Sequence, residues 1–279
     1  MSRMGAQDGY LLDNRRREAG RRFDAFAELF DPWTFAHLDR LGLGAGWRCW
    51  EAGAGGPSVP AGLAKRVGPA GRVWATDLDT TWLTGPGTLP TGPDTAATEV
   101  LRHDVTREDP PATGLDLVHA RLVLVHLPDR AEVLGRLVSA LRPGGWLVVE
   151  DADPALQPLA CPAGGGAAEE RAERVRRGFR SLLAQRGADL AFGRSLPGLL
   201  RGAGLRHVQA EGYFPFSSAA GRELEAATVR QVRGQLTETE LATDTEIDEH
   251  LACLAGESLD VTTAPLITCW GRRDENPSA

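Results

Sequence analysis

The residues of this chain that are best suited to chemistry lie in and after one glycine turn. The stretch RCWEAGAGGPSVPAGLAKRVG, residues 48–68, starts as a short apolar run that ends at Glu51. It then breaks at Gly53, Gly55 and Gly56 before an apparent helix. Such a turn presents backbone N–H groups at a helix N-terminus, where the helix dipole favours negative charge. We therefore expect an anionic or strongly polar ligand at this turn.

Two familiar nucleotide-binding turns fit this stretch poorly. The phosphate loop of nucleoside triphosphatases needs a lysine directly after its last glycine, and this turn has none. A dinucleotide turn needs glycine or alanine where Ser58 stands, although Gly53 and Gly55 match its first two glycines. Glu51 would repel a pyrophosphate but suits the ammonium group of a ligand. Triphosphate hydrolysis is therefore excluded, and a dinucleotide is the weaker alternative.

Carboxylates also end the next two predicted strands. Asp77 ends a strand predicted at 72–77, and Asp104 ends one predicted at 99–104. Carboxylates accept hydrogen bonds from hydroxyl, amino and ammonium groups, and each charge-assisted bond contributes a net ~1.5–3 kcal/mol. Asp79 competes with Asp77 for this role, but its position favours capping of a following helix. The acids indicate a ligand that is rich in such donors.

Two residues are candidates for moving a proton. His126, in LVLVHLPD, has a side chain that titrates near neutral pH and suits a general base. Its place at the predicted start of a helix equally favours a capping or packing role. Asp151 ends the strand predicted at 145–151, where it could orient or deprotonate a substrate. Both are therefore candidate catalytic residues, and for each of them a purely structural role is the alternative.

Short apolar strands alternate with helices between residues 47 and 151, and this alternation must position the acids. Strands and helices that take turns pair in parallel through right-handed crossovers, which predicts a doubly wound α/β sheet. Open sheets of this kind bind ligands at the carboxyl ends of their strands. The predicted strands are 47–52, 72–77, 99–104, 115–120 and 145–151, and the predicted helices lie near 58–67 and 128–142.

Segments outside this alternation are expected to form a helical cap and the last strands. We predict an N-terminal helical lid at 1–44, a cofactor-binding core at 45–153 and a helical insertion at 154–192. Residues 193–279 hold the final strands, at 204–216 and 261–273, with a further helical insertion at about 220–257. The aromatic residues expected to wall a pocket are Phe23, Phe26, Phe30, Phe192, Tyr213, Phe214 and Phe216.

Composition narrows the classes of partner. The formal net charge of −7 argues against a surface that neutralises a nucleic-acid backbone. The four cysteines are scattered without metal-ligand spacing, which predicts a reduced protein without a metal site. No apolar run is long enough to span a membrane, and the N-terminus lacks a signal-peptide core. We expect a cytoplasmic protein that binds neither nucleic acid nor membrane.

Taken together, five motifs in order resemble the class I S-adenosylmethionine-dependent methyltransferases, and most closely small-molecule enzymes of actinobacterial type. The motifs are WEAGAGG, WATDLD, LRHDV, LDLVHARLVLVHLPD and LRPGGWLVVED, within residues 45–153. The resemblance implies a Rossmann-like, doubly wound, mostly parallel sheet of seven strands. Its last strand is antiparallel, and helical insertions form the cap. The cofactor implied is S-adenosylmethionine, with S-adenosylhomocysteine as product.

The resemblance also implies roles for individual residues. Glu51, Gly53 and Gly55 would line the methionine end of the cofactor. Asp77 would hold the ribose, and Asp104 would meet the adenine edge. The implied cofactor-binding residues are Glu51, Gly53, Ala54, Gly55, Asp77, Leu78, Asp104, Val105, Ala120 and Arg121. Pro57 departs from the family pattern, which commonly has glycine there, but proline is tolerated in the first turn of a helix.

The function implied is in-line methyl transfer to oxygen, nitrogen or carbon of a small molecule. A sulfonium is a good leaving group, so proximity, alignment and exclusion of water suffice without a metal. Two alternatives stay open: a methyltransferase-fold protein that binds the cofactor without transfer, as a cyclase or binding module, and an NAD(P)-dependent oxidoreductase. Cap helices with exposed apolar residues are candidates for a homodimer interface.

Overall fold

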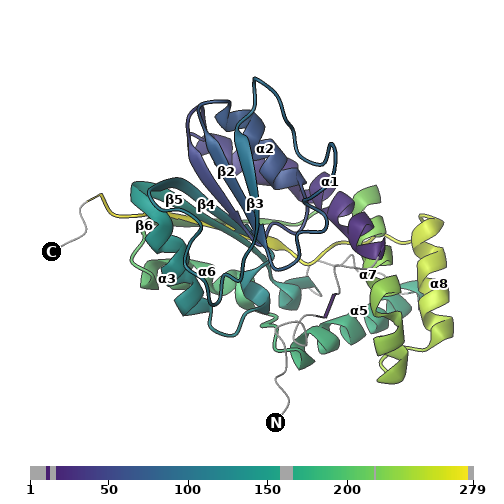
Figure 1. Ribbon diagram of the computed structural model, residues 1–279. Helices are drawn as coiled ribbons and strands as arrows, with labels where there is room; N and C mark the ends of the chain where they lie inside the picture. Colours follow the sequence, from purple (N-terminus) through teal and green to yellow (C-terminus); the bar gives the residue numbers. More distant parts are fainter. Residues whose placement is uncertain (1–10, 13–16, 158–165, 217, 276–279) are drawn as a thin grey trace, which may run out of the picture. The chain divides into compact units, whose positions relative to one another are not determined.

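The computed structural model describes residues 11–12, 17–157, 166–216 and 218–275 of the 279-residue chain. They fall into two compact units, whose elements are drawn in Figure 1. The sheet unit comprises Phe30–Asp151, Phe192–Tyr213 and Leu266–Ala279, and the helical unit comprises Met1–Leu29, Ala152–Ala191 and Phe214–Pro265. Helix α1 (Arg17–Arg40) contributes residues to both units.

The sheet unit holds a seven-stranded sheet with the order β3-β2-β1-β4-β5-β7-β6. The pairs β1–β2, β1–β4, β2–β3 and β4–β5 are parallel, whereas β6 and β7 are antiparallel. The strands are β1 (Arg48–Ala52), β2 (Arg72–Asp77), β3 (Ala97–Arg102), β4 (Leu115–Arg121), β5 (Leu141–Ala152), β6 (Arg206–Tyr213) and β7 (Leu266–Arg272). The predicted doubly wound sheet with an antiparallel last strand is confirmed.

Helices cover both faces of this sheet. Cys49 points to the face packed against α2 (Ser58–Val67) and Phe35 of α1, and the next residue, Trp50, points to the other face. That second face is covered by α3 (Arg130–Ala140) and α6 (Phe192–Gly202), opposite α2 in Figure 1. Side chains alternate along each strand, so residues two apart share a face. This alternation decides which side chains meet at the edge of the sheet.

The helical unit is organised by α5 (Ala167–Gln185), α7 (Ala219–Glu238) and α8 (Asp244–Ala255) around an apolar core. A buried polar cluster joins them: Glu225 accepts hydrogen bonds from Arg176 at 2.6 Å and lies 2.8 Å from His250 Nε2. Burial opposes the charge of Glu225, but Arg176 and His250 outweigh it and lower its pKa to about 2. The cluster is therefore an internal ion pair that joins the three helices.

Several predicted boundaries are wrong. The strand predicted at 99–104 is β3, which runs from Ala97 to Arg102 and pairs with β2 up to Arg102 opposite Asp77. Asp104 therefore lies two residues beyond the strand and not at its end. The helix predicted to 142 ends at Ala140, and β5 begins at once because an irregularity in its pairing with β4 accommodates the Arg-Pro-Gly-Gly segment. The helical segment predicted at 220–257 is two helices, α7 and α8.

The units also divide the chain differently from the predicted domains. The insertions predicted at 154–192 and 220–257 fall almost entirely within the helical unit, while the predicted lid at 1–44 is divided after Leu29. Within the described part of the chain, no helix combines the length and apolar character needed to cross a bilayer.

Candidate functional site

The glycine turn adopts the conformation that its sequence predicts. Gly53 has φ +69° and Gly55 has φ +60°, in the left-handed region that glycine adopts without strain. A Cβ on Gly53 would also lie 2.4 Å from Val123 Cγ2, so no side chain fits there. Helix α2 follows at Ser58, with Pro57 as its N-cap at φ −81°. The departure at Pro57 is therefore accommodated at the helix start.

Asp77 holds this turn from the neighbouring strand. Its Oδ2 accepts a hydrogen bond from Gly55 N at 2.9 Å, and its Oδ1 accepts one from Asp79 N at 2.9 Å. Burial raises the pKa of Asp77, and the backbone N–H donors of Asp79 and Gly55 oppose that rise. Ala54 is fixed as well, since its N–H donates to Thr76 O at 2.9 Å. The ends of β1 and β2 therefore form one pre-organised edge.

The residues after Asp77 differ in role. Leu78 is 40% exposed, which is unusual for a large apolar residue and leaves its side chain available to a ligand. Asp79 does not cap a helix, contrary to the prediction, because the chain forms only a turn there. Its Oδ1 accepts from Thr81 N at 3.0 Å within that turn.

Asp104 takes part in a local turn of the same kind. Its Oδ1 accepts hydrogen bonds from Thr106 N at 2.9 Å and from Thr106 Oγ1 at 2.5 Å. Its Oδ2 lies 3.7 Å from Arg107 Nε, and Val105 packs partly buried against the core. The structure thus places Asp104 and Val105 in the loop that follows β3.

The backbone is strained directly after the end of β4. Ala120 is buried, Arg121 is mostly buried, and Leu122 has φ +58°, a conformation that a leucine rarely adopts. Leu122 N donates to Glu150 O at 2.7 Å, which fixes the turn against β5. Ala120 and Arg121, the last two residues of β4, therefore lie at the same edge as the glycine turn.

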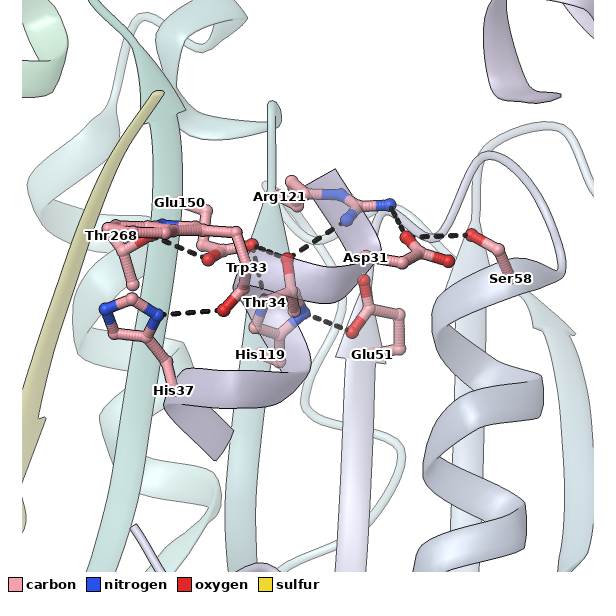
Figure 2. A network of polar contacts seen from close by, with 10 residues as sticks. All are labelled: Asp31, Trp33, Thr34, His37, Glu51, Ser58, His119, Arg121, Glu150 and Thr268. Atoms are coloured by element: carbon pink, nitrogen blue, oxygen red, sulfur yellow. Dashed lines mark hydrogen bonds and ion pairs between the residues drawn. The ribbon is translucent and has the colours of Figure 1, made fainter. Parts of the chain in front are cut away.

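A row of three buried ionisable side chains crosses the sheet at this edge, and Figure 2 shows it. Glu51 of β1 lies with its Oε2 2.5 Å from His119 Nδ1, and Glu150 of β5 has its Oε2 3.4 Å from His119 Nε2. All three are at most 1% exposed. We refer to Glu51, His119 and Glu150 as the buried row.

Helix α1 and strand β7 complete the hydrogen bonding of Glu150. The hydroxyl of Thr34 forms a short hydrogen bond with Glu150 Oε2, and the hydroxyl of Thr268 donates to Oε1 at 2.7 Å. Trp33 Nε1 in turn donates to Thr268 Oγ1 at 2.8 Å. Because buried carboxylates are costly without partners, these contacts fix the second half of α1 on the sheet.

An ion pair lies beside the buried row. Arg121 Nη2 donates to Asp31 Oδ1 at 2.9 Å, and Arg121 Nη1 donates to Thr34 Oγ1 at 3.1 Å. Ser58 Oγ, at the start of α2, lies 3.3 Å from the same oxygen of Asp31 (Figure 2). Three elements, α1, β4 and α2, are thus joined by polar contacts next to the glycine turn.

The charges of the buried row follow from its burial and its neighbours. Burial alone would lower the pKa of His119, but the carboxylates of Glu51 and Glu150 outweigh it and raise this pKa to about 9. Burial raises the pKa of Glu51 despite His119. Burial opposes the charge of Glu150 too, yet His119, Arg121 and the Thr34 hydroxyl together lower its pKa. His119 therefore carries a proton at neutral pH.

The two candidate bases are placed very differently. Asp151 is fully buried, and its Oδ2 accepts hydrogen bonds from Leu124 N at 3.1 Å and Val125 N at 3.3 Å. Burial raises its pKa well above the ordinary value. His126 ends η1 (Leu124–His126), a single turn of 3-10 helix, and is partly exposed. Asp151 therefore anchors the turn that carries His126.

Of the predicted pocket walls in the sheet unit, Phe192 is buried in the core beside α3 and cannot line a pocket. Tyr213, at the end of β6, stacks on Trp33 with ring centroids 4.9 Å apart and meets the edge of Phe30 at 6.2 Å. Phe30 and Tyr213 thus lie together at the end of β6, and their role as pocket walls stays a prediction.

Sequence reasoning missed the partners of Glu51. His119, Glu150 and Thr268 each lie two residues from a core residue on the face covered by α2: Leu117, Val148 and Trp270. These three polar residues stand among apolar strand residues on that face, and this pattern is the feature of the sequence that could have revealed a buried polar cluster. Among the described residues, no group of three or more His, Cys, Asp or Glu side chains is placed to hold a metal ion.

Comparison with known proteins identifies the family. The model of the methyltransferase domain matches residues 14–210, more than half of the chain, so the chain belongs to this family. A similar protein is methyltransferase str3 of Strobilurus tenacellus, 38% identical over 95 residues, or 32% of this chain and 31% of the relative. Another is the ubiquinone/menaquinone biosynthesis C-methyltransferase UbiE of Laribacter hongkongensis, 27% identical over 132 residues, or 46% of this chain and 52% of the relative.

Solved structures share the fold. Phosphoethanolamine N-methyltransferase 2 of Haemonchus contortus matches with a TM-score of 0.55 at 14% identity, over 95% of this chain and 60% of that one. A methyltransferase of an antibiotic biosynthesis pathway from Anabaena variabilis also has a TM-score of 0.55, at 16% identity, over 85% of this chain and 94% of that one. The chain therefore spans about a third of the length of str3 and about half of the length of UbiE.

Proposed function

We propose that the chain transfers a methyl group from S-adenosylmethionine to a small-molecule acceptor. The observation that carries this proposal is the contact between Asp77 and Gly55, which joins a carboxylate to a glycine turn at the carboxyl edge of a parallel sheet. Membership of the methyltransferase-domain family supports it. So do the relatives, which are methyltransferases and include a ubiquinone/menaquinone biosynthesis C-methyltransferase.

The residues at the edge fit this cofactor chemically. Gly53 and Gly55 carry no side chains, so a ligand can approach the backbone of the turn closely. Asp77 is partly exposed and accepts hydrogen bonds, which suits ribose hydroxyls, while the exposed Leu78 beside it offers an apolar surface for a base. Asp104 and Val105 are assigned to the adenine edge, and Ala120 and Arg121 to the sulfonium region.

The buried row refines the role of Glu51. Its Oε2 is engaged by His119, so we assign the ammonium group of the cofactor to the remaining oxygen, Oε1, together with the turn residues Gly53, Ala54 and Gly55. When bound, S-adenosylmethionine supplies an electrophilic methyl group on a good leaving group. The residues of the chain therefore need to bind, align and exclude water rather than to activate the methyl group.

His126 is the candidate base for an acceptor that must lose a proton, because it is partly exposed and Asp151 fixes its turn. Asp151 itself acts as the support of that turn. The acceptor is assigned to the class of small molecules. A cytoplasmic location, a homodimer and the absence of a nucleic-acid partner remain predictions from the sequence.

Calorimetric titration with S-adenosylmethionine, S-adenosylhomocysteine and NADH tests the proposal. Binding of the first two without NADH supports it, and binding of NADH alone would return the chain to the dinucleotide class. Formation of S-adenosylhomocysteine with a panel of phenol, amine and quinol acceptors then separates methyl transfer from cofactor binding without transfer.

A further inference from the structure

The buried row has a defined net charge at neutral pH. One proton fits between Glu51 Oε2 and His119 Nδ1, which lie 2.5 Å apart, and with that single proton the two side chains together are neutral. Glu150 is held ionised by His119, Thr34 and Thr268. The row therefore carries one negative charge, and its side chains are at most 1% exposed.

The charged groups around the row do not cancel this charge. Arg121 of β4 is paired with Asp31 of α1 at 2.9 Å, so that pair is neutral. Asp151, next to Glu150 on β5, is buried, and burial raises its pKa well above the ordinary value, which disfavours its charged form. The remaining contacts come from the hydroxyls of Thr34 on α1 and Thr268 on β7.

The cofactor and its product differ in the charge on their sulfur atom, and a charged row of side chains interacts with that charge. S-adenosylmethionine and S-adenosylhomocysteine share the adenosine and amino-acid ends, but only the first carries a positive sulfonium. When the methyl group bonds to the acceptor, sulfur keeps the electron pair of the broken bond and becomes a neutral thioether. Buried charges are weakly screened and act over longer distances than exposed ones.

We infer that Glu150 is a positioning residue which, through the buried row, sets the preference of the cofactor site for the sulfonium cofactor over its neutral product. This inference rests on the proposed function. Glu150 acts by giving the row one net negative charge at the carboxyl edge of the sheet, on β5, which lies two strands from the glycine turn after β1. Loss of the positive charge on transfer then weakens the attraction and favours product release.

The test is the ratio of the dissociation constants of S-adenosylhomocysteine and S-adenosylmethionine, measured by calorimetry from pH 6 to pH 9. Effects on folding or on the shared parts of the two ligands cancel in this ratio. For the wild type we expect a flat ratio up to about pH 8, because His119 keeps its proton. For Glu150→Gln the row is neutral at pH 6, so the ratio falls by about three- to tenfold.

The pH dependence of this variant distinguishes charge from structural damage. With one carboxylate removed, the pKa of His119 falls, and its proton is lost within the range measured. The row then regains its negative charge, and the ratio returns towards the wild-type value as the pH rises. Thr268→Val is the matched control, because it removes a hydrogen bond to Glu150 and no charge. Its ratio is expected to stay flat.

A flat, wild-type ratio for Glu150→Gln at every pH would overturn the inference. If circular dichroism shows that this variant does not fold, the wild type itself provides the test between pH 8 and pH 10. Its ratio is expected to rise severalfold as His119 loses its proton near pH 9, and an unchanged ratio would overturn the inference. If the wild type binds neither ligand, the proposed function fails instead.

Discussion

Asp77 Oδ2 accepts a hydrogen bond from Gly55 N at 2.9 Å, so a carboxylate on β2 fixes the backbone of the turn that follows β1. The same carboxylate is partly exposed and is available to a ligand at the edge of the sheet. One residue thus shapes the turn and offers acceptors to whatever binds there. The account of the cofactor site depends on this dual role.

Asp77→Ala should weaken the binding of S-adenosylmethionine by about 1–3 kcal/mol, because hydrogen bonds to a charged acceptor are lost and the turn loses its support. Calorimetry measures the change directly. Asp116→Asn is the matched control: Asp116 accepts hydrogen bonds from Arg48 and Arg142 near the start of β4, away from the carboxyl edge. An equal loss in both variants would remove the ribose role of Asp77.

Gly53→Ala should destabilise the fold more than Gly46→Ala. Both glycines have positive φ, +69° and +83°, so each alanine costs about 1–2 kcal/mol of backbone strain. Only at Gly53 would the new Cβ meet a neighbour, Val123 Cγ2 at 2.4 Å, which adds about 1–3 kcal/mol of overpacking. Urea unfolding of the two variants measures the difference.

Val123→Ala in the Gly53→Ala background should recover part of the stability, since it removes the methyl groups that clash. If the double variant is less stable than Gly53→Ala by the full cost of Val123→Ala alone, the clash is not the cause. The turn would then have more room than the contact with Val123 implies.

Stability should fall as the pH rises through about 9 because of His119. Its pKa in the folded protein lies above the ordinary 6.5, so its stabilisation is fully present below about pH 6.5 and is lost as His119 deprotonates near pH 9. The shift corresponds to about 3 kcal/mol as an upper value. The free energy of unfolding between pH 6 and pH 10 measures it.

His119→Asn provides the comparison, because buried Cys49 and Cys269 also have raised pKa values and weaken the fold in alkali. The difference between wild type and variant isolates the contribution of His119. If the two pH curves run parallel, His119 is not charged in the buried row.

Asp151→Ala should destabilise the protein by about 1–3 kcal/mol, since the N–H groups of Leu124 and Val125 lose their buried acceptor. Asp151→Asn keeps an acceptor of the same shape and should cost clearly less, because burial raises the pKa of Asp151 and already disfavours its charged form. Thermal unfolding compares them. Equal losses would argue that the negative charge of Asp151 is needed.

The sequence was sufficient to predict the edge of the sheet, because β1 and β2 end where their apolar runs meet Glu51 and Asp77. The seven strands and the antiparallel pair followed from the resemblance and are confirmed. Asp104 was placed at a strand end, yet β3 begins at Ala97 and ends at Arg102, since its pairing with β2 sets its length. The local sequence pattern of β3 does not specify how its residues pair with those of β2.

The buried row could not be predicted in the same way. Glu51 and His119 are partners because β4 pairs directly with β1, although two strands separate them in the sequence. The contact of Thr34 with Glu150 depends on how α1 packs on the sheet, which its amphipathic pattern does not determine. From the sequence alone, His119 and Glu150 could be recognised only as polar residues within apolar strands.

The most direct test of the central claim is calorimetric titration of the purified protein with S-adenosylmethionine, with Asp77→Ala in parallel and NADH as the competing ligand. The account predicts binding to the wild type, binding weakened by about 1–3 kcal/mol in the variant, and none of NADH. Binding of NADH without S-adenosylmethionine would contradict it.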